Sequence, residues 1–219
     1  MATASFHHER SDRDSGEQPR RGEGPLAVYA GVAVNLALRL TMLYFAYDSI
    51  VNGSDQRYNG KNLGVRNMLI CFGFAMLFPA LQYVWKKWEN YPVWFDALYL
   101  SMFWMDMMGN YFNLFDTYDD FDLLPHFYGP GALAVVLAGA FGVAPLIAWG
   151  ITMALHATLE LQEWLGDLFM HGHNVRGWWD SAHDLGSGLV GATLYVWVFS
   201  KWHSPKKHPP ENDDKEHDR

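Results

Sequence analysis

The sequence contains very little cysteine and no segment that would direct secretion. Its single cysteine, Cys71, lies in an apolar run, so an internal disulfide is excluded. The amino end is polar and charged with no apolar stretch behind its charges, which argues against a cleavable signal peptide. No segment repeats at a fixed period. We therefore expect a single domain that is held together without covalent cross-links.

Charge is scarce between the two ends of the chain. Residues 1–24 and 203–219 are polar and charged, whereas 50% of all residues are hydrophobic. Neither end can bury enough apolar surface to offset the entropy lost on ordering, so both are predicted to be disordered tails. Residues 25–202 are predicted to form a transmembrane helical domain.

Apolar blocks recur between these tails, with lengths near the ~20 residues that a helix needs to cross a bilayer. The two blocks around FGVAP are divided there, because Pro145 suits the first turn of a helix, although the sequence leaves open whether both are full crossings. We predict an all-α polytopic membrane protein, a bundle of about six transmembrane helices. The predicted helices lie near residues 26–50, 64–85, 93–115, 124–141, 143–166 and 181–202.

Basic residues are divided unequally between the two faces of this predicted bundle. Six crossings would place both tails on one side, which carries eleven Lys and Arg residues against four on the other. The positive-inside rule therefore predicts that both termini are cytoplasmic and that the acidic loops are extracytoplasmic. We expect a multi-pass protein of the plasma (inner) membrane with lipid as its partner. With a formal net charge of −8, we expect no nucleic-acid partner.

Acidic residues gather where the fifth predicted helix ends and the sixth begins. Glu160 and Glu163 are three residues apart and share a helix face with His156, one turn earlier. Acidic groups are disfavoured at the carboxyl end of a helix, whose exposed carbonyls are partly negative, unless a cation lies nearby. Asp180 and Asp184 are four residues apart and share a face, although capping of the sixth helix would also explain them.

A histidine at the start of the fourth predicted helix lies at the same membrane face. His126 follows Asp122 by four residues, and the topology brings its imidazole near the two acidic pairs. Such donors suit Mg²⁺, Mn²⁺, Ca²⁺, Zn²⁺ or Fe, so we predict a divalent cation site. A proton-sharing carboxylate cluster and plain helix capping are the alternatives. The predicted metal ligands are His126, Glu160, Glu163, Asp180 and Asp184.

A second polar layer is predicted deeper in the bundle. Asp106, Asn110 and Asn113 form one stripe on the third predicted helix, and Asn35 and Arg39 are four residues apart on the first. At ~1.5 Å per residue, Arg39 and Asp106 lie at a similar depth from the outer face. An unpaired charge there is costly, so we predict an Arg39–Asp106 ion pair. The pair would fix helix register or line a headgroup pocket or polar path.

Three blocks in a fixed order carry a family resemblance: HFYGPG at 126–131, ELQEW at 160–164, and WWDSAHD at 178–184 before a glycine-rich helix. Over about residues 95–195 the chain resembles the YjdF-type bacterial inner-membrane proteins. More distantly it is similar to VanZ-like membrane proteins, although Glu163 stands where those usually carry Gln. The YjdF resemblance implies a small multi-pass membrane protein whose biochemical role is not established.

Three functions are compatible with this pattern. A metal-dependent enzyme would activate water or polarise an ester or phosphate oxygen of a lipid or lipid-linked substrate, with Glu160 and Glu163 as catalytic residues. No serine or cysteine nucleophile stands out, so a metal-bound water is the expected nucleophile. A cation-binding or transport protein would use the same carboxylates, although transporters often contain a repeat. A membrane scaffold would use a structural metal site.

Overall fold

The computed structural model describes residues 24–59, 61, 63–170, 175 and 177–203, and this part of the chain is helical without strands. The predicted tails lie almost entirely outside the described residues. The elements in chain order are α1 (Pro25–Val51), α2 (Leu63–Phe72), η1 (Phe74–Met76), α3 (Leu77–Trp85), η2 (Trp88–Asn90), α4 (Val93–Tyr111), α5 (Leu114–Thr117), α6 (Leu123–Ala140), α7 (Pro145–Met170) and α8 (Trp178–His203).

Prolines and glycines explain where several helices begin and break. Pro25 and Pro145 open α1 and α7, where a missing backbone N–H costs nothing. Gly73 and the short η1 interrupt the rod formed by α2 and α3, and Pro79 follows in the first turn of α3. The predicted division at FGVAP is confirmed, since α6 ends at Ala140 and α7 begins at Pro145.

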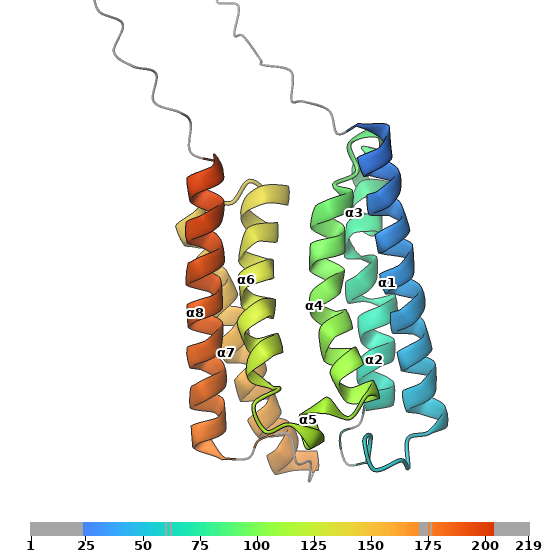
Figure 1. Cartoon of the computed structure of the whole chain (residues 1–219), viewed down its shortest axis with the longest axis vertical. Helices are drawn as coiled ribbons and strands as arrows, with labels where there is room; N and C mark the ends of the chain where they lie inside the picture. Colours follow the sequence, from blue (N-terminus) through green and yellow to red (C-terminus); the bar gives the residue numbers. More distant parts are fainter. Residues whose placement is uncertain (1–23, 60, 62, 171–174, 176, 204–219) are drawn as a thin grey trace, which may run out of the picture.

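The long helices form two groups that lie side by side (Figure 1). One group contains α1, the α2–α3 rod and α4, and the other contains α6, α7 and α8. Contacts between α4 and α6 join the two groups. The start of α1 and the end of α8 lie at one end of the molecule, whereas α5 and the start of α8 lie at the opposite end (Figure 1). We call this opposite end the site end.

Three helical segments are long and apolar enough to cross a membrane: α1, the rod Leu63–Trp85, and α6. Large apolar side chains on them face outward, including Leu26 and Val65, which are 82% and 81% exposed. The long helices α4, α7 and α8 do not meet the same standard. They carry buried acidic residues, among them Asp96, Glu160 and Asp184. The all-helical fold is therefore compatible with a membrane protein, and its more polar helices carry several buried acidic residues.

Very close approach between α6 and α8 depends on glycine. Gly191 of α8 lies against the backbone of Phe127 in α6, and a Cβ atom on Gly191 would overlap the Phe127 carbonyl group. Gly131 of α6 lies against the ring of Tyr195 in α8, where an added Cβ atom would be 2.8 Å from the nearest ring atom. Small residues at helix contacts let backbones approach in membrane proteins, where dispersion forces replace the hydrophobic effect. This contact sets the distance between the two helices that flank the candidate site.

The predicted Arg39–Asp106 ion pair is wrong, because each residue has another partner. Arg39 Nη2 donates to Asp96 at 3.1 Å (Oδ1) and 2.8 Å (Oδ2), and also to the Ala75 carbonyl at 3.1 Å. Asp106 instead pairs with Arg66 of α2 at 2.6 Å. Asp96 and Asp106 are roughly 15 Å apart along α4. Depth counted from the predicted helix ends did not identify which of the two Arg39 reaches, because the packing of α1 against α4 decides it.

The Arg39–Asp96 pair is completed by neutral donors and acceptors. Asp96 is fully buried at 0% exposure and also accepts a hydrogen bond from the Tyr91 hydroxyl. Burial, and then this hydrogen bond, raise the pKa of Tyr91, so it remains a neutral donor. Asn35 accepts from Arg39 Nη1 at 3.0 Å and donates to the Val93 carbonyl at 2.7 Å. A buried ion pair of this kind needs such additional bonds to offset desolvation.

The other two residues of the predicted polar layer make local contacts. Asn110 is buried, and its side chain donates to the Asp106 backbone carbonyl at 3.0 Å. Asn113 follows α4 in a left-handed conformation with φ 57° and precedes α5. The four residues of the predicted layer therefore belong to separate polar groups.

Replacing Gly191 by Ala is expected to destabilise the protein, because the added methyl would overlap the Phe127 carbonyl group. Overpacking of this kind costs about 1–3 kcal/mol. The matched control is Gly186→Ala in the same helix, where nothing lies within 4 Å of the added Cβ and alanine favours the helix. Thermal unfolding in detergent measures both variants. Equal unfolding temperatures would contradict the close α6–α8 contact.

Asp96→Asn is expected to lower the free energy of unfolding by about 3 kcal/mol, because it leaves the partly buried Arg39 charge unpaired. The double variant Arg39→Met with Asp96→Leu removes both charges and should recover most of that loss. Asp106→Asn should lower the free energy of unfolding by less, because the side chain of Arg66, the partner of Asp106, is 39% exposed. Denaturant unfolding in detergent ranks the variants. A larger loss for Asp106→Asn than for Asp96→Asn would contradict the assigned pairing.

Candidate metal site

One buried stripe of α7 carries polar residues into the interior of the α6–α8 group. Ala148, Thr152, His156 and Glu160 follow one another at four-residue spacing and are 0–4% exposed. Four residues make just over one turn, so these side chains share a face. Leu159 on another face is 56% exposed. The helix thus places its polar stripe inward and apolar side chains outward, as a lipid-facing helix does.

Two imidazoles and one carboxylate meet where this stripe faces α6. His126 Nδ1 of α6 lies 2.9 Å from His156 Nε2 and 3.2 Å from Glu160 Oε1. His156 Nε2 lies 3.6 Å from the same oxygen of Glu160. These three residues can each offer one ligand atom within 4.8 Å of the others. The arrangement could hold one metal ion between α6 and α7.

A second group lies on the other side of the His126 ring. Asp122 Oδ1 is 3.3 Å from His126 Nε2, and Asp184 of α8 completes a group whose ligand atoms also lie within 4.8 Å of one another. Asp122 precedes α6 but makes no side-chain capping bond. Asp184 is the seventh residue of α8, which is too far from the helix start for capping. Helix capping therefore explains neither carboxylate.

Small and hydroxyl residues of α8 fix the three helices around these groups. Gly188 lies directly against the His156 ring, where a Cβ atom would overlap the imidazole. Ser187 Oγ donates to the Leu123 carbonyl of α6 at 2.8 Å. Trp164 Nε1 of α7 donates to Ser181 Oγ at 2.8 Å. The imidazole of His156 therefore has a single well-defined position between α6 and α8.

Burial of the Glu160 carboxylate is electrostatically unfavourable, and hydrogen bonds from the described residues do not offset that cost. It is 4% exposed, and neither carboxylate oxygen accepts a hydrogen bond of standard geometry from the part of the chain that the structure describes. The Ser181 hydroxyl interacts favourably with it but falls short of that geometry. Buried polar groups without hydrogen bonds are rare, and an unpaired buried carboxylate is costly. A positive species beside Glu160 would remove this cost.

The structure brings three of the five predicted ligands into the two groups. His126, Glu160 and Asp184 lie in the two groups, whereas the half-buried Glu163 and Asp180 belong to neither. His156 and Asp122 lie in the groups but were not among the predicted ligands. Their spacing was the available signal, because His156 precedes Glu160 by four residues and Asp122 precedes His126 by four. The second imidazole shifts the donor set toward softer divalent ions such as Zn²⁺.

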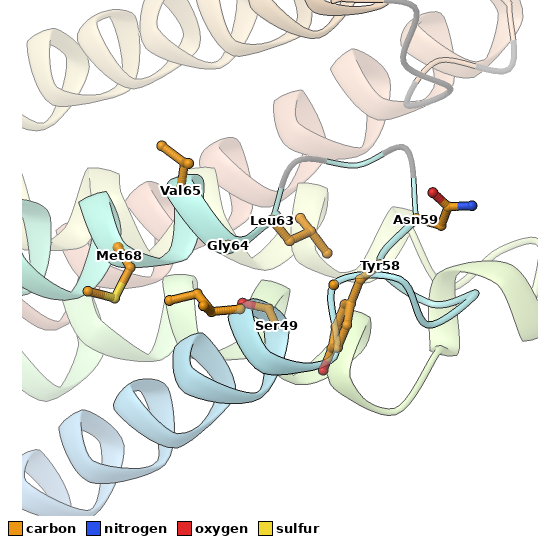
Figure 2. Close-up of a pocket in the computed structure, with 9 residues that line it drawn as sticks. Ser49, Tyr58, Asn59, Leu63, Gly64, Val65 and Met68 are labelled. Atoms are coloured by element: carbon orange, nitrogen blue, oxygen red, sulfur yellow. The ribbon is translucent and has the colours of Figure 1, made fainter.

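A separate polar cluster lies at the same end in the other helix group. Asp48 accepts from the Tyr58 hydroxyl at 2.6 Å and pairs with Arg57 at 3.2 Å. Burial, and then the bond to Asp48, raise the pKa of Tyr58, so the phenol stays neutral. A shallow pocket beside it is lined by Ser49, Tyr58, Leu63 and Met68 among others, from α1, α2 and their connection (Figure 2). Its lining is largely apolar and holds no cluster of metal ligands.

Comparisons with known proteins give no match. No protein-family model, curated protein or solved structure matches this chain. The resemblance to YjdF-type proteins therefore depends on the three sequence blocks alone. The chemistry of the site follows from its own residues and their geometry.

Proposed function

We propose that this chain is an inner-membrane protein with six crossings that binds one divalent cation between α6, α7 and α8. The observation that carries the proposal is the buried Glu160 carboxylate, which lacks a hydrogen bond of standard geometry and lies 3.2 Å and 3.6 Å from two imidazole nitrogens. A divalent ion would join all three donors. The YjdF-type family assignment is part of the same proposal.

The proposed orientation has both termini in the cytoplasm and the site end outside it. Six long helical segments alternate in direction, which supports an even number of crossings (Figure 1). The tail side carries eleven Lys and Arg residues and the site end four, which supports this orientation by the positive-inside rule. The cation would therefore enter from the extracytoplasmic side.

The donor set favours Zn²⁺ or Fe²⁺ over harder ions. His126 Nδ1, His156 Nε2 and a Glu160 oxygen make a two-histidine, one-carboxylate set, which leaves a coordination position open for water. Donors bound to a tetrahedral Zn²⁺ at ~2.0–2.1 Å lie about 3.3 Å apart. The three donor atoms are separated by 2.9, 3.2 and 3.6 Å, so only small shifts would be needed.

The site could perform hydrolysis on a lipid or lipid-linked substrate. The cation would polarise an ester or phosphate oxygen and lower the pKa of a bound water. Glu163 lies one turn beyond Glu160 and is half-buried, and it would accept the proton from that water. His126 is the fourth residue of α6, so the site lies about one turn from the helix start, near the headgroup level. A transported cation or a structural metal is the competing function.

Purified wild-type protein equilibrated with Zn²⁺ and dialysed is expected to retain one ion per chain, measured by elemental analysis. Glu160→Gln should lose the ion, because it removes the charged ligand. Glu89→Gln, an exposed acidic residue at the opposite end, is the matched control and should retain it. Equal Zn²⁺ content in the wild type and Glu160→Gln would overturn the proposal. It would favour the alternative in which the carboxylates and imidazoles share a proton. Stripped protein that stays folded would favour chemistry over a structural role.

Asp122→Asn is expected to weaken Zn²⁺ binding about 10–100-fold without changing the stoichiometry, because the Asp122 carboxylate lies 3.3 Å from His126 Nε2 and helps to orient the imidazole. Asp120→Asn in the same turn is the control and should leave the affinity unchanged. Competition with a chelator of known affinity provides the measurement. Complete loss of the ion in Asp122→Asn would instead place it in the group formed by Asp122, His126 and Asp184.

A further inference from the structure

Basic residues are few at the site end, and two of the three described ones, Arg57 and Lys61, are paired with carboxylates. Arg57 pairs with Asp48 and Asp55, each at 3.2 Å, and its Nη1 donates to the Tyr111 carbonyl at 2.7 Å. Lys61 pairs with Asp116 at 2.9 Å. Each of these cations is matched by carboxylates of its own. Their positive charge is therefore balanced by carboxylates within the fold.

Arg66 is different because most of its donors are unused. Its Nη2 donates to Asp106 at 2.6 Å, while its Nε is buried without a hydrogen-bond partner among the described residues. A guanidinium has five N–H donors in a planar fork that matches carboxylate and phosphate oxygens. The Arg66 side chain is 39% exposed and that of Asp106 is 32% exposed. The Arg66–Asp106 pair is therefore partly accessible to solvent.

The Arg66–Asp106 pair lies at the same end of the molecule as the candidate metal site and at a similar depth. Arg66 is the fourth residue of α2 and His126 is the fourth residue of α6, and both helices start at the site end. Both residues thus lie about one turn, roughly 5 Å, inside that end. The Asp106 carboxylate is near enough to Glu163 for the two to repel each other electrostatically. Arg66 and the cation site therefore border one polar region.

We propose that Arg66 binds the phosphate group of the substrate beside the cation, so that the protein acts on a phosphate-bearing molecule. This inference rests on the proposed function. The site end carries eleven acidic against four basic side chains and would repel an anion elsewhere. An arginine fork and a divalent cation together supply the positive charge that a phosphate needs. Asp106 holds the guanidinium in place through Nη2 and leaves Nη1 for the ligand, since Nε is buried.

The same chemistry would recognise a lipid headgroup or a free phosphate, so the experiment uses both probes. Full-length protein in a neutral detergent is loaded with Mn²⁺ and mixed with dihexanoyl phosphatidic acid or with inorganic phosphate. Equilibrium dialysis measures binding of each probe, and paramagnetic relaxation of the ³¹P signal reports whether its phosphorus lies near the Mn²⁺. We expect the wild type to bind phosphatidic acid with enhanced relaxation. Binding of inorganic phosphate alone would assign the site to a soluble phosphate compound.

Arg66→Gln is expected to weaken probe binding at least about tenfold while the Mn²⁺ content is unchanged. Lys61→Gln removes one positive charge at the same end and is the matched control, which should bind as the wild type does. The double variant Arg66→Gln with Asp106→Asn leaves no unpaired acid, and it should show the same weakening if Arg66→Gln folds poorly. Arg66→Lys keeps the charge but not the fork, so it should recover binding only in part.

The outcomes separate this inference from the proposed function. If the wild type binds neither Mn²⁺ nor Zn²⁺ but Arg66→Gln still weakens dialysis binding, the cation proposal fails and the phosphate site stands. If Mn²⁺ binds but neither probe does, the phosphate site fails. It also fails if Arg66→Gln and its double variant bind as strongly as Lys61→Gln.

Discussion

The buried carboxylate of Glu160 is the constraint on which this structure depends. A negative charge in the interior of a membrane helix group is costly unless it is paired, and the nearest basic groups to Glu160 among the described residues are two imidazoles. Its position therefore requires His126 on α6, His156 on α7 and a glycine at 188 that lets α8 reach the His156 ring. The close packing of α6 with α8 and the composition of the site follow from the same requirement.

The other helix group solves a similar problem in a different way. Asp96 is completely buried, but it receives hydrogen bonds from Arg39 and Tyr91, so its charge is balanced within the fold. Such a satisfied pair favours a fixed arrangement of α1 against α4. Glu160 lacks this internal balance among the described residues. The group of α1 to α4 is therefore stabilised by its own contacts, whereas a ligand would be stabilising in the group of α6 to α8.

Helix positions could be predicted from the sequence because apolar length, proline and glycine act locally. The break before Pro145 and the meeting of His126, Glu160 and Asp184 followed from helix order and spacing alone. The partner of Arg39 could not be predicted, since the depths of Asp96 and Asp106 depend on where the helices end and on how α1 packs against α4. The rotation of α7 turns His156 toward His126 together with Glu160, which changes a carboxylate-rich set into one with two imidazoles.

The sequence by itself determined that the chain is helical, that three of its helical segments are apolar enough for a membrane, and that acidic residues collect at one end. These properties depend on composition and on spacing within a single helix. Only the tertiary structure decided which polar groups touch, because contacts between helices depend on rotation, tilt and the glycines that permit close approach. It thereby paired Arg66 with Asp106, placed His156 beside Glu160 and left the Glu160 carboxylate without a standard hydrogen bond among the described residues.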